Sequence, residues 1–150
     1  MRETEGNGLY DDLMVQRRAI GERLSRIAER APAVVDEYHL RLKARTEELM
    51  ARAELKVGEV DLIREVAVFA ERSDISEETQ RLAAHLEQFE QILGRNNNEP
   101  AGRTLDFLAQ ELLREANTIA SKSNDAEISR MIVEVKGSID RIKEQVQNVE

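Results

Sequence analysis

Residues 102–127 combine, on one side of a predicted helix, the side chains that phosphodiester chemistry uses. At about 100° per residue, two polar stripes run side by side along this helix. The first pairs carboxylates with an ammonium group and consists of Glu111, Glu115, Thr118 and Lys122. The second adds guanidinium and amide groups and consists of Arg103, Gln110, Arg114, Asn117 and Ser121. Carboxylates on successive turns can hold a hard divalent cation, and nearby Arg or Lys side chains can bind phosphate.

Two interpretations of these stripes remain open. In the first, Glu111 and Glu115 face a solvent-accessible groove and help to bind a divalent cation, which lowers the pKa of bound water. In the second, the same residues form an ordinary solvated helix face that weak i,i+4 pairs stabilise. Arg114 and Lys122 are then internal counter-charges for the two carboxylates. The spacing alone favours this second interpretation.

Two further places carry titratable side chains. His85 borders the apolar stripe of its predicted helix and lies on the same side of that helix as Glu78. A histidine at such a border is more often a boundary residue than a ligand. Acidic residues between Glu65 and Glu78, Asp74 among them, gather near a predicted helix end, where capping and solvation explain them. The sequence contains no Gly-rich phosphate loop, no HExxH and no Ser-His-Asp spacing. The polar side of 102–127 is therefore the main candidate site.

Composition indicates that long helices position these residues. The 150 residues include 52 charged side chains and few aromatics, a bias that favours helices over sheets. Apolar residues recur at spacings of three and four in every segment, as on one face of a helix. The sequence predicts an all-α fold, with a long amphipathic helical hairpin followed by a compact helical bundle. We expect a hairpin or coil-like region in 1–58 and a compact helical domain in 59–150.

Punctuating residues predict where the helices begin and end. Pro32 indicates either a new helix or a kink in a long one, and Gly58 indicates a break. The strongly apolar segment 62–70 predicts a helix central to its half, and Ser76 is the expected N-cap of the next helix. The clearest loop is 94–102, with three consecutive Asn residues and a Pro. The helix after it should bury four residues together: Leu105, Leu108, Leu112 and Ile119.

Charge and composition exclude several classes of protein. The net charge of −8 argues against a simple RNA-binding module, because a uniform negative field repels a polyanion. The absence of cysteine excludes disulfides, zinc–thiolate sites and cysteine nucleophiles. No run approaches the ~20 apolar residues of a membrane span, and the start MRETEGNG does not resemble a signal peptide. We therefore expect a soluble, cytoplasmic protein with no membrane partner.

Several long segments resemble the YicC-like family of endoribonucleases. The segment GRTLDFLAQELLREANTIASKSNDAE, with the ending KEQVQNVE, resembles the C-terminal signature of that family. The segment EVAVFAERSDISEETQRLAAHLEQF resembles its second block, and APAVVDEYHLRL and EGNGLYDDL are also similar. The resemblance spans nearly all of the chain. Family members carry a further N-terminal domain, so this chain corresponds to their C-terminal half.

The resemblance implies a function and a set of site residues. Members assemble as hexamers and cleave single-stranded RNA with a divalent cation, usually manganese, with magnesium as the alternative. The family's motif positions in this chain are Glu65, Arg72, Asp74, His85, Arg103, Asp106, Gln110, Glu111, Arg114, Glu115, Asn117, Ser121, Lys122 and Asp125. We predict three catalytic residues: Glu111, Glu115 and His85. The predicted metal ligands are Glu111, Glu115, Asp106 and Asp74. The predicted phosphate-binding residues are Arg103, Arg114, Lys122 and Arg72.

A second hypothesis assigns no catalysis to this chain. It describes a non-catalytic oligomerisation or adaptor module, with any catalysis in the missing N-terminal half. The acidic charge and the coil-like first 50 residues support it. The chain departs from the family pattern at two positions, with Glu71 where Asp is frequent and Ala84 where Ser is common. Neither departure removes a type of side chain that could be a ligand. Under both hypotheses we expect the chain to self-associate, because its N-terminal apolar stripe has few partners within the chain.

Overall fold

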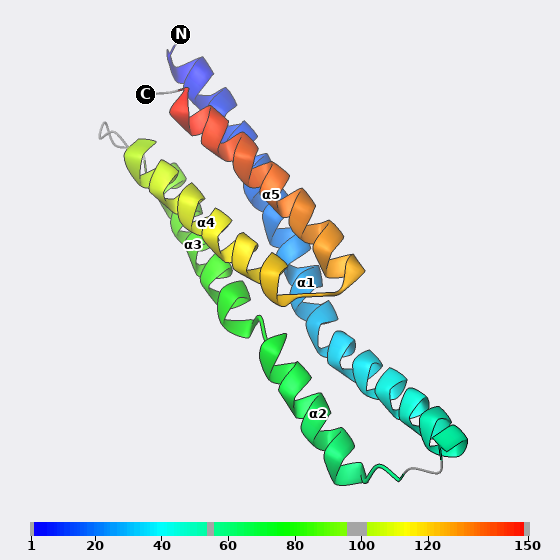
Figure 1. The fold of residues 1–150 in the computed structure, drawn as a ribbon. Coiled ribbons are helices and arrows are strands. Elements are labelled where there is room, and N and C mark those ends of the chain that lie inside the picture. The colour runs from blue at the N-terminus through cyan, green and yellow to red at the C-terminus, as the bar shows by residue number, and fades with distance from the viewer. Residues whose placement is uncertain (1, 54–55, 96–101, 149–150) are drawn as a thin grey trace.

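The computed structural model describes residues 2–53, 56–95 and 102–148, and all regular structure in these ranges is helical. The helices are α1 (Arg2–Ala53), α2 (Glu59–Arg72), α3 (Ser76–Gly94), α4 (Gly102–Lys122) and α5 (Ala126–Gln147). No strand occurs in the described ranges, which confirms the predicted all-α fold (Figure 1). No helix found there is long and apolar enough to cross a membrane.

Four helices form a bundle, which we define as α1 up to Val34 together with α3, α4 and α5. These elements pack side by side around one apolar core, to which all four contribute (Figure 1). The residues predicted to be buried together on α4 all belong to it: Leu105, Leu108, Leu112 and Ile119. The spacing of three and four along each helix therefore identified the core face correctly.

The rest of α1, from Val35 to Ala53, forms with α2 a two-helix extension that we call the arm. The arm projects beyond the bundle (Figure 1), and α2 packs against α1. The sequence predicted a hairpin within 1–58, but α1 runs without a turn from Arg2 to Ala53, so the second leg of the arm is α2. Tyr38 and Phe69 stack between the two legs, with ring centroids 3.8 Å apart.

The prediction that 62–70 forms a central helix is wrong. No residue of α2 is buried, and Ile63 remains 56% exposed. The segment is apolar on most sides, but α1 covers only one of those sides. Hydrophobicity alone therefore did not indicate the position of this helix.

The helix boundaries follow the punctuating residues in part. The predicted break at Gly58 is confirmed, and Gly58 is the N-cap of α2, whereas Pro32 lies inside α1 and starts no new helix. Ser76 is the first residue of α3 and not its N-cap, because the Asp74 carboxylate accepts the hydrogen bond from the Ser76 backbone N–H, at 3.0 Å. The predicted loop separates α3 from α4, and its residues 96–101 lie outside the described ranges.

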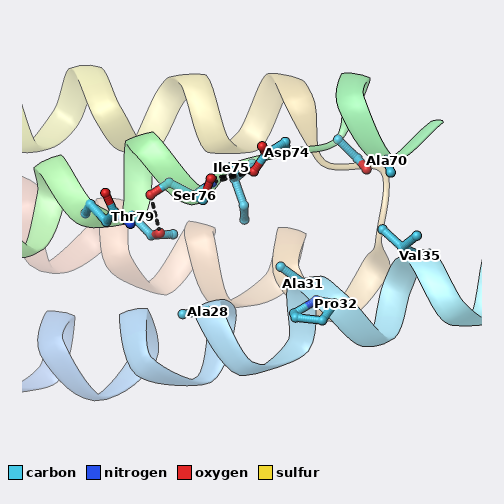
Figure 2. Close-up of a pocket in the computed structure, with 11 residues that line it drawn as sticks. Ala28, Ala31, Pro32, Val35, Ala70, Asp74, Ile75, Ser76 and Thr79 are labelled. Carbon is cyan, nitrogen blue, oxygen red and sulfur yellow. Dashed lines mark hydrogen bonds between the residues drawn. The ribbon is translucent and has the colours of Figure 1, made fainter. Parts of the chain in front are cut away.

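A pocket of about 550 Å³ lies where the arm meets the bundle (Figure 2). α1 lines one side of it with small apolar residues, and the end of α2 and the turn into α3 line the other. The labelled lining residues in Figure 2 are Ala28, Ala31, Pro32, Val35, Ala70, Asp74, Ile75, Ser76 and Thr79. Packing is therefore incomplete at the junction between the two regions.

Candidate functional site

The antiparallel helices α3 and α4 bring candidate residues together along one edge of the bundle. Arg81 Nε on α3 donates a hydrogen bond of 3.0 Å to Glu115 Oε1 on α4, and this contact shows the register of the two helices. One turn further along each helix in opposite directions come His85 and Glu111, which therefore lie at the same level. We call this surface the α3–α4 edge. Its residues are Glu78, Arg81, His85 and Gln88 of α3, and Phe107, Glu111, Glu115 and Lys122 of α4.

The two predicted glutamates of this edge differ in their surroundings. The Glu115 side chain is only 7% exposed and pairs with Arg81, whose pKa is raised chiefly by that hydrogen bond. The prediction that Glu115 faces a solvent-accessible groove is therefore wrong. Glu111 is half-buried, and it makes no ion pair with another residue of the described ranges. Glu111 is thus the carboxylate of this pair with no internal counter-charge.

Lys122 is paired with a glutamate inside the bundle. Lys122 Nζ donates to Glu78 Oε1 at 2.9 Å and to the backbone oxygen of Asp74 at 3.3 Å. The bond to Glu78 raises the pKa of the Lys122 ammonium. The Glu78 side chain is 3% exposed, and its second oxygen, Oε2, is buried without a hydrogen-bond partner among the described residues. The Lys122 ammonium therefore interacts mainly with the Glu78 carboxylate.

Asp74 lies at the start of α3, beside the Lys122 end of the edge. Its carboxylate accepts hydrogen bonds from the backbone N–H and the hydroxyl of Ser76 (Figure 2). These bonds lower the pKa of Asp74, and the charge of Lys122 lowers it further. Asp74 thus has a capping role that its own geometry explains. Arg72, two residues earlier, ends α2 as an exposed side chain.

The remaining predicted residues lie outside this edge, although Arg103 comes one turn before Phe107 at its end. Asp106 lies on the side of α4 that faces α5, because it accepts hydrogen bonds from Gln110 at 3.1 Å and from Gln147 at 3.5 Å. Arg103 and Arg114 are exposed on the outer face of α4. Both are available to a ligand in solution, but neither contacts the glutamates of the edge in any described hydrogen bond or ion pair.

The predicted metal ligands do not converge on one point. Within the described ranges, no three His, Asp or Glu side chains converge well enough to hold a metal ion. Three of the four predicted ligands have other partners, since Glu115 binds Arg81, Asp74 binds Ser76 and Asp106 binds Gln110. These side chains alone therefore do not fit a resident metal ion. Glu111 with Glu115 could hold a cation only together with oxygens from elsewhere, such as phosphate oxygens.

His85 has one defined contact on the edge. Its Nδ1 lies 3.2 Å from Oε1 of Gln88, one turn further along α3. An amide oxygen only accepts hydrogen bonds, so this contact is satisfied when Nδ1 carries the proton. Nε2 is then the nitrogen of the ring that can accept a proton.

Two residues of the edge, Arg81 and the buried Glu78, were not predicted as site residues. They meet their partners Glu115 and Lys122 across 34 and 44 residues of sequence, so no local spacing shows these contacts. One sign was available in the sequence. Polar residues recur on α3 at 78, 81, 85 and 88, a stripe that matches the one on α4.

Comparisons with known proteins identify the family of this chain. The family described as "Endoribonuclease YicC-like, C-terminal" matches residues 27–150. The proteins named "Probable endoribonuclease YicC" from Clostridioides difficile (strain 630) and Haemophilus influenzae are each 36% identical to this chain over 150 residues. The match covers all of this chain and 50% of each relative, so the chain spans about half the length of these curated relatives. On this evidence, the chain belongs to the endoribonuclease YicC-like family and matches its C-terminal domain.

Proposed function

We propose that this chain is the C-terminal part of an endoribonuclease that cleaves single-stranded RNA, and that the α3–α4 edge is its reaction site. Membership of the family and the names of the relatives support the class of activity. The observation that carries the choice of site is the placement of His85 and Glu111 at one level, next to Glu115. A base and an unpaired carboxylate are thereby available to one phosphodiester.

His85 is the proposed proton-transfer group of this site. Its Nε2 is free to accept a proton when Nδ1 donates to Gln88. In that state it takes a proton from the attacking oxygen, or returns one to the leaving oxygen. Gln88 fixes the ring through Nδ1 and so determines which nitrogen faces the RNA.

A divalent cation, manganese or magnesium, is the proposed cofactor, and it supplies charge neutralisation at the phosphate when bound. Glu111 is its first proposed ligand, with Glu115 one turn away. Such an ion often binds through one or two carboxylates together with substrate phosphates. This fits a chain whose described carboxylates form no three-ligand group. We propose that Asp106 and Asp74 contribute more to the stability of the fold than to cation binding.

Exposed guanidinium groups are the proposed phosphate-binding residues. Arg72, Arg103 and Arg114 lie on the surface and form no ion pair within the described ranges. A guanidinium can bind a phosphate through two parallel hydrogen bonds. In a chain of net charge −8, such local positive groups are needed to hold RNA. Lys122 contributes less, because Glu78 offsets its charge.

Cleavage of a 5′-labelled single-stranded RNA by the purified chain in Mn²⁺ tests this proposal. We expect cleavage that requires the cation and is abolished by Glu111→Gln, with the melting temperature nearly unchanged. His85→Ala should also abolish it. Glu144→Gln, the same change at an exposed position of α5, is the control and should cleave normally. Normal cleavage by Glu111→Gln would remove Glu111 from the site, and no cleavage by the parent chain would refute its activity.

The arm favours a second candidate function, self-association as an oligomerisation or adaptor module. Large apolar side chains stay exposed on it, among them Leu40 at 68% and Val60 at 68%. Large exposed apolar patches often mark protein-binding surfaces. We propose that copies of the chain associate through the arm, and that the full-length protein forms a hexamer. Light scattering that gives a 17.1 kDa monomer at micromolar concentration would contradict this. An oligomer that binds RNA without cutting it would identify an adaptor.

A further inference from the structure

A second pocket lies between α3 and α4, beyond His85 and Glu111 on the side away from Lys122. It has a volume of about 350 Å³. Its lining combines two amides, a guanidinium and a hydroxyl with three apolar side chains: Gln88, Gln91, Ile92, Arg95, Thr104, Phe107 and Leu108. Apart from Gln88, none of these residues has a part in the reaction proposed above. The pocket therefore needs its own explanation.

Phe107 is the unusual member of this lining. The other two phenylalanines are satisfied within the protein, since Phe89 is fully buried and Phe69 stacks on Tyr38. Phe107 is 58% exposed at the wall of the pocket. A single exposed apolar residue needs no explanation by itself. An exposed ring beside a pocket with convergent polar groups is, in contrast, the usual form of a small binding site.

The charges at this end of the bundle differ from those at the other end. Toward the Lys122 end, Arg81 and Lys122 are each paired with a buried carboxylate. Arg95, in the pocket, and Arg103, one turn before Phe107 on α4, form no ion pair within the described ranges. Residues four apart lie on one side of a helix, so Arg103 and Phe107 are neighbours. The pocket thus lies beside two guanidinium groups in a protein that is acidic overall.

We propose that this pocket binds one base of single-stranded RNA, with the base stacked on Phe107 and the adjoining phosphates held by Arg95 and Arg103. Stacking on aromatic rings together with cationic contacts to the backbone is the general mode by which proteins bind single strands. The amides of Gln88 and Gln91 provide donors and acceptors for the edge of the base. This inference rests on the proposed RNA substrate and adds a subsite to it.

The position of the pocket relates the bound base to the reaction site. Gln88 lines the pocket and also contacts His85, and Phe107 lies one turn before Glu111 on α4. A base in the pocket therefore places a neighbouring phosphodiester at the level of His85 and Glu111. The subsite would thus determine which bond of the RNA is cut relative to the base that it holds.

The test measures binding of a labelled single-stranded RNA by anisotropy, with no cation, so that cleavage is not required. Phe107→Leu keeps an apolar side chain at an exposed position and removes the ring. We expect it to weaken binding about tenfold, within the range for loss of one stacked base. Val133→Ala, at a position 68% exposed on α5, is the control and should bind as the parent does. Arg95→Gln and Arg103→Gln should each lower the slope of log affinity against log salt by about 0.7.

A fluorescence measurement gives a second, independent result. The chain contains no tryptophan, so Phe107→Trp introduces a single tryptophan at the pocket, which can be excited apart from the two tyrosines. We expect it to bind RNA at least as tightly as the parent, with emission quenched by stacking. Unchanged emission at saturating RNA, or parent-like binding by Phe107→Leu, overturns the subsite even where the parent cuts RNA. A Phe107→Leu variant that binds RNA normally but loses self-association identifies a protein contact instead. A parent chain that neither binds nor cuts RNA refutes the proposed function as well.

Discussion

The bundle and the arm share helix α1, but large apolar residues of this helix are buried in the bundle and exposed in the arm. Ile27 of α1 lies in the bundle and is fully buried, whereas Leu40, 13 positions later on the same helix, is 68% exposed. Both residues belong to regions with the same spacing of apolar positions. The difference arises from the number of neighbours, because α1 meets α3 and α5 in the bundle but only α2 in the arm. Periodicity thus determines which residues share a face, and the neighbouring helices determine whether that face is buried.

The comparison between α2 and α3 shows again that apolar composition does not determine burial. The apolar segment of α2 predicted a central helix, yet none of its residues is buried. α3 is more polar in appearance but buries Leu82, Leu86 and Phe89 almost completely. Free energy from burial depends on the area removed from water. Burial in the bundle therefore contributes most of the free energy of unfolding. Four substitutions, each in a named place of the bundle or the arm, test this statement.

The largest effect is expected from truncating a bundle leucine. Leu82 has no exposed surface, so Leu82→Ala removes a buried side chain and leaves a cavity. We expect a loss of about 2–5 kcal/mol in the free energy of unfolding. Leu40→Ala makes the same chemical change in the arm and should cost less than about 0.5 kcal/mol. Urea denaturation followed by circular dichroism measures both, and similar losses in the two variants would abolish the distinction between bundle and arm.

The next largest effect concerns the arm alone. Phe69 stacks on Tyr38 and packs against the edge of the core. Phe69→Ala removes both contacts, and the stack alone contributes about 0.5–1.5 kcal/mol beyond the area buried. Because α2 has few other contacts, we expect faster hydrogen exchange in α2 and little change in α4. Val68→Ala, on the adjacent exposed side of the same helix, is the control. Uniformly faster exchange in both helices would show that arm and bundle unfold together.

The sequence predicted the local features of this fold and missed those that depend on helix pairing. Helical spacing identified the core face of α4, and Gly58 marked a break, because both depend on residues close in sequence. His85 and Glu111 were candidates separately, but their common level depends on the register of α3 and α4. The contact between Arg81 and Glu115, 34 residues apart, shows that register, and no local pattern specifies it. Glu115 was expected to face solvent for the same reason.

A smaller effect, of opposite sign, is expected at the boundary between the two regions. Pro32 lies inside α1 and lines the pocket at the junction. Its nitrogen cannot donate to the carbonyl oxygen of Ala28, and its ring crowds that carbonyl. Pro32→Ala restores the bond, while the more flexible unfolded chain offsets part of the gain. We expect a net stabilisation of about 1 kcal/mol by urea denaturation. A destabilised variant would show that α1 needs the proline geometry at this junction.

The smallest effect concerns the ion pair that joins α1 to the start of α5. Arg30 Nη2 donates to Asp125 Oδ1 at 3.0 Å, and the same guanidinium bonds Glu37 of the arm. Asp125 is also the N-cap of α5 and accepts a hydrogen bond from the Ile128 backbone N–H. Asp125→Asn keeps a capping side chain and removes only the charge. Because the pair is partly screened by solvent, we expect a loss of under about 1 kcal/mol at pH 7.

The dependence of that loss on pH identifies its cause. The bond to Arg30 lowers the pKa of Asp125 below its ordinary value of 3.8. A carboxyl whose pKa is lower in the folded state stabilises the protein fully above its unfolded value, and this stabilisation disappears as the pH falls through the folded value. The parent and Asp125→Asn should therefore differ at pH 7 and at pH 5, and they should converge below pH 3.8. Asp140→Asn, an exposed position of α5, should match the parent throughout. A gap that persists unchanged at low pH would assign the effect to capping, and the pair of Arg30 with Asp125 would then contribute nothing measurable to stability.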